Sequence, residues 1–391
     1  MKSNYDYEAL GKHIRLVDYR NSEEVTSTVL GISIDKEFMP SVANVIGTDL
    51  SRYKLISKGL FACNPMHVGR DERLPIALYE NEEPAIVSPA YFMFEIIDRT
   101  ILNEEYLMMW FRRPEFDREC WFMTDGSVRG GITWDDLCRI QLPVPPYERQ
   151  LDVVESYRAI TRRIAMKKEI NDNLEATAQA VFQEQFASFY GADELPDGYR
   201  IINLDNLCTV KGGKRLPADC KLLDTPTDHP YIRVRDVGSN RYVCLTNQFQ
   251  YIDEETYSAI SRYIVNTGDI VISIVGTIGL LGKIHSSLDK ANLTENCVKL
   301  ANIHTVTSDY LYYTLCYKKQ IKEIDLLTVG AVQAKLPMYN IQSMKILVPP
   351  TKAIEAFQRK MNVLNEQIEA NTVEIQKLYE LEEVLLAKLS D

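Results

Sequence analysis

The chain repeats itself at a fixed distance of 204 residues. Leu142-Pro143-Val144-Pro145-Pro146 returns as Ile346-Leu347-Val348-Pro349-Pro350. Two further landmarks, Gly126-Ser127-Val128-Arg129 and Tyr106-Leu107, return in the same register as Gly330-Ala331-Val332-Gln333 and Tyr310-Leu311. Three matches without a gap indicate a tandem duplication. A chain of 391 residues is therefore expected to form two similar halves, each with its own core.

A long helix is predicted after each Pro-Pro pair. Apolar residues recur there in steps of three and four, the spacing of one face of a coiled coil, and neither 147–190 nor 351–391 contains Gly or Pro. Proline is tolerated in the first turn of a helix, so each Val-Pro-Pro is interpreted as a rigid joint between strand and helix. The predicted seam comprises Tyr157, Ile160, Ile164, Asn171, Leu174 and Val181 in the first helix and Met361, Leu364, Ile368, Asn371, Leu378 and Leu385 in the second.

The polar residues of the seam predict how the two helices pair. A pseudo-twofold axis between the halves would place Asn171 opposite Asn371. Because a lone Asn in an apolar seam fixes the register of a coiled coil, we predict an antiparallel coiled coil in which these side chains meet. The alternative, two unrelated amphipathic surface helices, leaves the superposition of the seams at the repeat distance unexplained.

The globular halves are predicted to be α+β domains rich in strand. In the second half, Gly268-Asp269 opens an apolar run over 270–275, which Gly276-Thr277-Ile278-Gly279 closes. The comparable stretch of the first half, 59–65, lies 209 residues earlier. Short β-branched runs between glycines are typical of strands. The predicted segments are therefore 1–146 and 192–350 as globular domains, with helices over 147–191 and 351–391.

The sequence carries no constellation that would perform chemistry. Val144-Pro145-Pro146-Tyr147 is similar to the Asn/Asp-Pro-Pro-Tyr motif of adenine-N6 methyltransferases, but Val cannot accept a hydrogen bond from an amino group. The stretch 211–215, Lys-Gly-Gly-Lys-Arg, lacks the spacing of a phosphate-binding Walker loop. The eight cysteines form no C-x-x-C pair, so we expect reduced thiols and no metal site. We predict a non-catalytic protein without a cofactor.

Two diverged globular halves, each followed by a similar long helix, make a chain that resembles the specificity subunit of type I restriction–modification enzymes. The resemblance covers nearly the whole chain, and the architecture carries it more than any single string. The local strings that agree are Tyr231-Ile232-Arg233-Val234-Arg235-Asp236-Val237, the Gly276-Thr277-Ile278-Gly279 loop, the Gly-Ser loop at 126–127, Asn64-Pro65-Met66, Ser88-Pro89-Ala90-Tyr91 and the Pro-Pro joints.

The resemblance implies two target recognition domains that read the halves of a bipartite site on double-stranded DNA. Because the two halves differ in sequence, that site is expected to be asymmetric. The resemblance also implies that the helices act as a spacer and as a docking surface for two methyltransferase subunits, to which two restriction subunits can add. A forty-residue helix is about 60 Å long, which bounds the separation of the half-sites. The expected location is the cytoplasm of a bacterium or archaeon, since no apolar run of eighteen residues and no secretion signal is visible.

Basic and polar residues near the glycine loops are the candidates for DNA contact. Between 208 and 241, seven basic residues stand against four acidic ones, the most basic stretch of a chain whose net charge is −11. Arginine can bridge guanine O6 and N7 or bind phosphate, whereas ordinary solvated charges or internal ion pairs are the alternative. The candidates are His67, Arg70, Arg73, Ser127, Arg129, Lys211, Lys214, Arg215, Arg233, Arg235, Thr277, Gln333 and Lys335.

The acidic balance qualifies the DNA-reading hypothesis. Phosphate neutralisation supplies most of the sequence-independent affinity for DNA, and an acidic chain lacks a general basic field. We therefore expect weak DNA binding by the isolated chain, with methyltransferase subunits closing around the duplex. Two rival interpretations are a coiled-coil adaptor whose globular halves bind protein, and an enzyme related to methyltransferases or nucleases.

Overall fold

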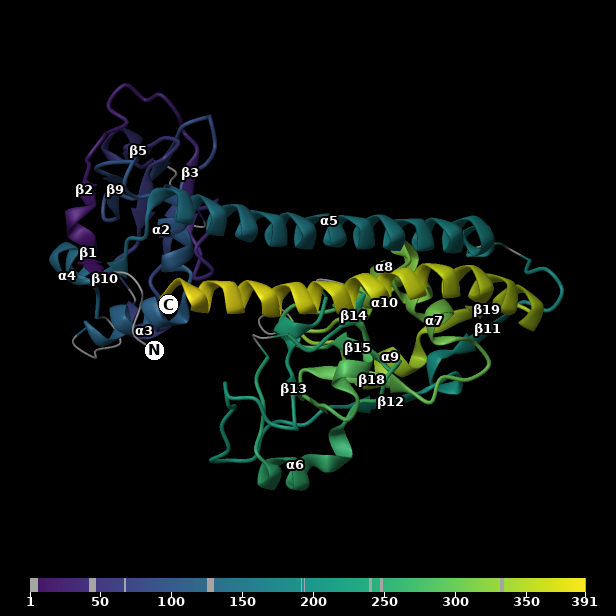
Figure 1. Ribbon diagram of the computed structural model, residues 1–391. Helices are drawn as coiled ribbons and strands as arrows, with labels where there is room; N and C mark the ends of the chain where they lie inside the picture. Colours follow the sequence, from purple (N-terminus) through teal and green to yellow (C-terminus); the bar gives the residue numbers. More distant parts are fainter. Residues whose placement is uncertain are drawn as a thin grey trace. The chain divides into compact units, whose positions relative to one another are not determined.

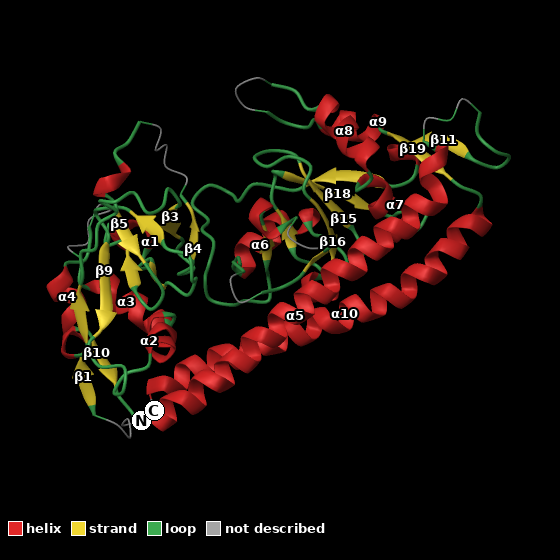
Figure 2. Ribbon diagram, turned by 90° about the horizontal axis from the view of Figure 1, so that it is seen from above, coloured by secondary structure: helices red, strands yellow, loops and turns green. Residues whose placement is uncertain are grey.

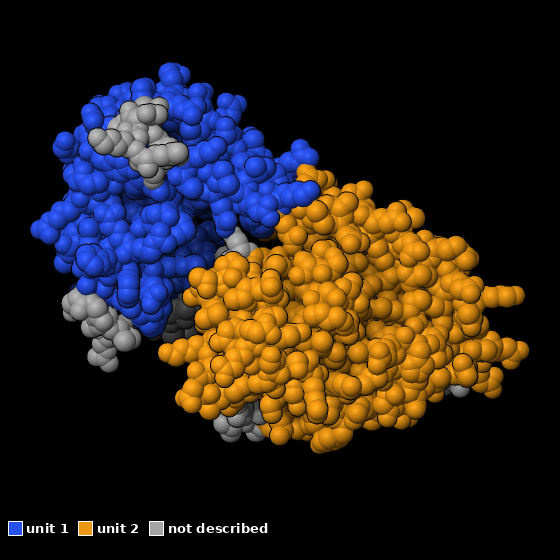
Figure 3. Space-filling model, turned by 60° about the horizontal axis from the view of Figure 1, so that its bottom comes forward, with its two compact units in different colours: residues 1–164, 377–391 blue, residues 165–376 orange. Residues whose placement is uncertain are grey.

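The chain divides into two compact units. The computed structural model describes residues 6–41, 47–66, 68–124, 130–190, 192, 194–238, 241–246, 249–330 and 334–390. The first unit comprises residues 1–164 and 377–391, and the second comprises residues 165–376 (Figure 3). Each unit thus contains one globular half together with a segment of both long helices.

The duplication is confirmed element by element. Helices α2 (Glu104–Phe111), α3 (Pro114–Phe122) and α4 (Trp134–Arg139) of the first unit recur as α7 (Ser308–Leu315), α8 (Lys318–Leu327) and α9 (Met338–Ser343) of the second. A buried hydrogen bond recurs with them. Tyr106 Oη donates to the Pro143 carbonyl over 3.2 Å, and Tyr310 Oη donates to the Leu347 carbonyl over 2.7 Å. Matching tyrosines therefore attach matching helices to matching strands.

The strands of the first unit form small, mainly antiparallel sheets (Figure 2). One four-stranded sheet has the order β2 (Ile14–Leu16), β9 (Phe92–Ile96), β6 (Phe61–Cys63), β7 (Ile76–Leu78), and another the order β4 (Phe38–Pro40), β3 (Val29–Ile32), β8 (Ala85–Val87), β5 (Lys54–Ile56). A third pairs β1 (Tyr7–Ala9) with β10 (Gln141–Pro143). The short helix α1 (Val68–Asp71) follows β6.

The second unit contains one five-stranded sheet and two strand pairs. The sheet has the order β12 (Thr209–Gly212), β18 (Cys297–Ala301), β15 (Ile270–Ser273), β16 (Leu281–Ile284), β14 (Tyr242–Val243) (Figure 1). The pairs are β13 (Tyr231–Ile232) with β17 (Asn292–Leu293), and β11 (Arg200–Asn203) with β19 (Lys345–Val348). Helix α6 (Glu254–Ile260) lies between β14 and β15 in the sequence. The strands predicted from the glycine-bounded apolar runs are present as β6 and β15, so the mixed α+β expectation is confirmed.

The two long helices are α5 (Tyr147–Phe186) and α10 (Thr351–Ala387), and each begins directly after a Pro-Pro pair. The first ends earlier than predicted, because a 3-10 turn over Ala187–Phe189 follows Phe186. Phe186 is fully buried among other rings, and Ala187 and Tyr190 beyond it still pack, partly buried, against the same core.

The two helices run antiparallel within the second unit. Asn371 Nδ2 donates a hydrogen bond to Asn171 Oδ1 over 2.8 Å, the contact predicted from the seam. The Phe182 and Phe357 rings lie 6.0 Å apart, and Lys167 Nζ lies 2.8 Å from a carboxylate oxygen of Glu374. Residue numbers thus rise along α5 as they fall along α10. All twelve predicted seam residues are buried or half-buried.

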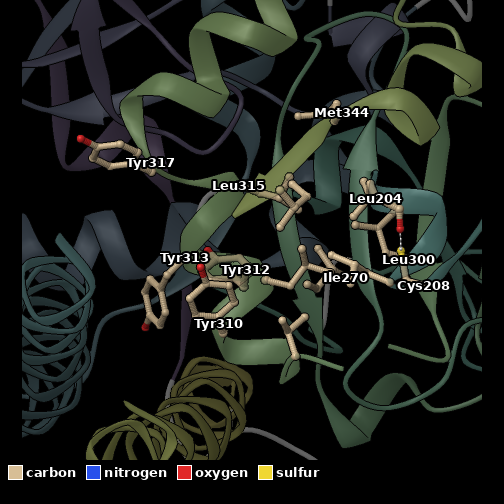
Figure 4. Packing of buried hydrophobic residues seen from close by; sticks show 14 of the residues in the cluster. Leu204, Cys208, Ile270, Leu300, Tyr310, Tyr312, Tyr313, Leu315, Tyr317 and Met344 are labelled. Atoms are coloured by element: carbon tan, nitrogen blue, oxygen red, sulfur yellow. Dashed lines mark hydrogen bonds between the residues drawn. The ribbon is translucent and has the colours of Figure 1, made fainter. Parts of the chain in front are cut away.

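Aromatic side chains join both helices to the core of the second unit. Phe182 and Phe186 of α5 lie 5.6 and 5.1 Å, ring to ring, from Tyr310 of α7, and Phe357 of α10 lies 6.1 Å from it. Figure 4 shows Tyr310 beside Tyr312 and Tyr313, with the strand residues Ile270 and Leu300 of the same cluster to their right. The helix segments are therefore part of the core of this unit. Burial of apolar side chains between the helices and the globular half stabilises their contact.

Candidate nucleic-acid interface

Several loops of the second unit meet at one end of its five-stranded sheet. Strands β12 and β15 both run antiparallel to β18, with Gly212 opposite Val298 and Ser273 opposite Cys297. The carboxyl ends of β12 and β15 therefore lie beside the amino end of β18. Candidate residues from distant parts of the sequence follow these strand ends.

Backbone hydrogen bonds tie these loops together. The Lys214 N–H donates to the Leu293 carbonyl over 2.8 Å, and the Ile274 N–H donates to the Asn296 carbonyl over 2.8 Å. The loop after α8 joins the same end, since the Leu336 N–H donates to the Ile274 carbonyl over 2.9 Å, and Lys335 pairs with Val275. Strand β13 also ends here. Its last carbonyl accepts from the Thr294 N–H over 3.0 Å.

We call this end of the five-stranded sheet, with the candidate residues that lie there, the sheet end. These are Lys214, Arg215, Arg233, Arg235, Thr277 and Lys335. Lys211 is exposed on β12 itself, opposite Lys299, and lies short of the sheet end. Gln333 lies outside the described residues.

The Gly276-to-Gly279 loop is a tight turn between β15 and β16. Gly276 and Gly279 both have φ of +81°, a left-handed conformation that favours glycine. Ser273 holds the turn from inside, because its hydroxyl donates to the Thr277 carbonyl over 2.6 Å and accepts from the Leu280 N–H over 2.8 Å. Thr277 is exposed at the tip of this turn.

The cations of the sheet end differ in how far they are committed to internal partners. Lys214 and Lys335 are exposed, and the Arg215 side chain is 80% exposed although its Nε lies 2.7 Å from a Glu295 oxygen. Such an exposed ion pair is weak and can exchange for a phosphate. Arg235 is also exposed, 3.7 Å from Asp236. Lys214, Arg215 and Lys335 are available to an anionic ligand.

Arg233 is placed differently from its neighbours. Its side chain is 18% exposed, and it is bonded to Asp236 and to Gln250. Burial lowers the pKa of its guanidinium, and Asp236 opposes that effect. Of the two interpretations that the sequence left open for Arg233, the geometry favours the internal ion pair, which shapes the turn that presents Arg235.

The first unit contains a matching arrangement. The Ile132 N–H donates to the Pro65 carbonyl over 3.1 Å, the equivalent of the bond from Leu336 to Ile274. The Gly69 N–H donates to the Gly130 carbonyl over 3.0 Å, which places α1 beside Gly130. Arg70 is exposed and pairs with Asp71, and Arg73 lies 3.3 Å from Asp35. His67, Ser127 and Arg129 lie outside the described residues.

Sequence reasoning missed Glu295 and Asn296, which complete the sheet end. Glu295 is the partner of Arg215, and the Asn296 carbonyl anchors the loop after β15. No motif marks them, because they become neighbours of the other loops only through strand pairing. The sequence offered one indication of their place, because they lie between two apolar runs that form strands.

A close approach of two backbones positions Lys214 and Arg215. A Cβ on Gly213 would lie 2.1 Å from the Thr294 carbonyl oxygen, whereas a Cβ on Gly212 would meet nothing within 4 Å. Gly213→Ala is expected to lower the free energy of unfolding of the second unit by about 1–3 kcal/mol, as overpacking does. Urea denaturation checks this, with Gly212→Ala as the matched control. Equal effects of the two variants would contradict the assigned approach.

The sheet end presents exposed cations and a hydroxyl, which can bind phosphate oxygens or the edges of bases. Within the described part of the chain, no three His, Cys, Asp or Glu side chains lie close enough to share a metal ion. None of the described helices combines the length and apolar character that crossing a membrane requires.

Comparison with known proteins points to one family. The sequence model of the family described as "Type I restriction modification DNA specificity domain" matches residues 196–384. The chain is 21% identical over 314 residues to the type I restriction enzyme MjaIX specificity subunit of Methanocaldococcus jannaschii, covering 75% of this chain and 70% of that one. It is 20% identical to the HindI specificity subunit of Haemophilus influenzae, over 96% and 95% of the two chains. The crystal structure of the type I restriction–modification S subunit from M. genitalium has the same fold, with a TM-score of 0.51, 14% identity, and coverage of 99% and 96%. In sequence over residues 196–384, and in fold over nearly the whole chain, this protein is therefore similar to type I restriction–modification specificity subunits.

Proposed function

We propose that the chain recognises DNA sequence for a type I restriction–modification complex, each half reading one part of an asymmetric bipartite site. The observation that carries the proposal is the sheet end, with its counterpart beside α1 in the first unit. Residues 1–146 and 192–350 act as the two target recognition domains in this proposal. Residues 147–191 and 351–391 act as the spacer.

The helix pair is proposed to dock two methyltransferase subunits, to which two restriction subunits can add. Large apolar side chains stand exposed along it. Met166 is 59% exposed on α5, and Val363 is 69% exposed on α10. Exposed apolar side chains on an otherwise charged helix are typical of a protein-binding surface. The chain itself supplies recognition without catalysis or a cofactor, and it acts in the cytoplasm.

The net charge of −11 argues for recognition within an assembly. The exposed cations of the sheet end form a local patch on an acidic protein, so phosphate contacts are few. The isolated chain is expected to bind DNA weakly. Methyltransferase subunits that enclose the duplex would supply the remaining contacts.

Single-molecule sequencing of host DNA, with and without the gene, tests the proposed function. Deletion is expected to abolish adenine methylation at one split, asymmetric motif, and reintroduction of the gene to restore it. A methylome that is unchanged by deletion, in a host with active adenine methylation, would contradict the proposal. Duplex protection by the assembled complex then separates DNA reading from the adaptor hypothesis.

A further inference from the structure

A buried arginine joins the second globular half to both long helices. The Arg241 side chain is 1% exposed and lies directly before β14. Its guanidinium forms an ion pair with Asp309 at the start of α7, and its Nη1 donates to Tyr313 Oη over 2.9 Å. Arg241 is one of the seven basic residues between 208 and 241, but its burial removes it from any DNA-facing surface.

The contacts of Arg241 continue onto the helices. Nη1 also donates to Asn365 Oδ1 of α10 over 2.5 Å and lies 3.7 Å from a carboxylate oxygen of Glu175 on α5. Glu175 in turn accepts a hydrogen bond from Tyr313 Oη over 2.9 Å. One side chain thus contacts the globular half and both helices.

Asp309 is the second centre of this cluster. Lys283 of β16 lies 2.6 Å from Asp309 Oδ1, while Gln358 and Asn365 of α10 donate to Oδ2 over 2.6 and 2.7 Å. Burial opposes ionisation of this carboxyl, but Lys283 and Arg241 lower its pKa to about 2. The carboxylate is therefore charged at neutral pH. We name these residues (Arg241, Asp309, Lys283, Glu175, Gln358 and Asn365) the buried ionic cluster.

Such a cluster constrains geometry more than apolar packing does. Apolar surfaces tolerate changes of side-chain arrangement, whereas a buried charge that loses its partner is strongly unfavourable. The forked guanidinium must meet acceptors on three elements at once. A slip of one residue along a helix moves it by about 1.5 Å, which is enough to break these hydrogen bonds.

The equivalent position in the first unit is built differently. At the repeat distance of 204 residues, Glu105 stands for Asp309, Thr161 for Asn365, and Tyr379 for Glu175. These three residues line an open cleft of about 820 Å³. Glu105 there pairs with Arg158 of α5, whose side chain is 49% exposed. The first half is therefore attached at this place by a solvent-accessible ion pair, which is weaker.

We propose that Arg241 is a positioning residue that holds the second recognition domain in one register on the helix pair, so that the complex accepts one spacer length between its half-sites. The inference rests on the proposed function, because spacer length has a meaning only for a bipartite site. The comparison of the two units supports it. The second half has a buried, directional attachment where the first has an open cleft.

The test measures adenine methylation by the assembled complex on duplexes that keep both half-sites and vary the spacer by one or two base pairs. For Arg241→Lys and Arg241→Met, methylation on neighbouring spacers relative to the native spacer is expected to rise at least about tenfold, the factor that corresponds to about 1.4 kcal/mol. The recognised bases are expected to stay unchanged. Arg200→Met, an exposed arginine on β11, is the control and keeps the spacer preference of the wild type.

Arg241→Lys keeps the buried positive charge but lacks the forked guanidinium. This variant therefore decides the outcome if Arg241→Met fails to fold. A lower rate with an unchanged spacer preference would mean a purely structural role and would overturn the inference. If the wild-type complex methylates a split motif and both variants keep one spacer, only the positioning role fails. If the wild-type complex methylates no split motif, the proposed function itself fails.

Discussion

Replacing Lys214, Arg215 and Lys335 together by glutamine is expected to weaken DNA binding by the assembled complex on the order of a hundredfold near physiological salt. The three side chains are exposed at the sheet end and come from two separate loops, Lys214 and Arg215 from the loop after β12 and Lys335 from the loop after α8. Each phosphate contact contributes about 0.9 to the slope of log affinity against log salt concentration, so the slope is expected to fall by about 3. Fluorescence anisotropy over a potassium chloride series measures both quantities.

The control for this charge removal is Lys290→Gln. Lys290 is exposed, and its backbone N–H bonds to Val265, ahead of β15 and therefore at the opposite end of the strand. It is expected to leave affinity and slope unchanged. A triple variant whose affinity, slope and base preference all equal those of the wild type would contradict the assignment of the sheet end. If the slope holds but preference relaxes at one base pair, Arg215 or a neighbour reads a base edge instead of a phosphate.

Phe182→Ala is expected to lower the free energy of unfolding of the second unit by about 3–5 kcal/mol, the cost of a large cavity in a core. Phe182 is fully buried on α5, with the rings of Phe186, Tyr310 and Phe357 between 5.4 and 6.0 Å away. Neither helix nor globular half can close the cavity without moving the other. The loss is therefore expected to loosen the attachment between them.

Hydrogen exchange in peptides from 165–186 and 306–317 measures this effect in the intact chain. Tryptophan fluorescence provides an internal reference, since Trp110, Trp121 and Trp134 all lie in the first unit. Its transition is expected to shift less than exchange in the second unit. Met166→Ala on the same helix is the control, because its side chain is 59% exposed. Similar exchange in the two variants would show that α5 is not part of this core.

The duplication and the long helices could be predicted because their signals are local or strictly periodic. A match at 204 residues needs no knowledge of packing, and a helix without Gly or Pro follows its apolar spacing. The Asn171–Asn371 contact was predicted for a related reason. In an apolar seam, two polar side chains are most stable where they bond each other. The early end of α5 at Phe186 was not predictable, because neither Gly nor Pro marks it before residue 191.

The candidate site was predicted residue by residue but not as an assembly. Thr277 and Lys335 were chosen for separate reasons, and their loops are joined by tertiary contacts, the pairing of Val275 with Lys335 and the hydrogen bond from Leu336 to Ile274. Glu295 was missed because the residues next to it in the sequence do not indicate that Arg215 is its partner. Strand pairing creates such proximities, and it depends on contacts between residues that are distant in the chain.

The sequence by itself determined that this protein consists of two similar halves and two antiparallel helices, and it indicated the family that the chain resembles. Those properties follow from the register of the repeat and from the period of the apolar residues, and both can be seen directly in the sequence. Only the tertiary structure decided what each basic residue does. Arg215 is exposed, Arg233 shapes a turn, and Arg241 is buried between the second half and both helices, although all three belong to one basic stretch. The charge of a side chain is a property of the residue, whereas its exposure depends on which non-local elements pack against it.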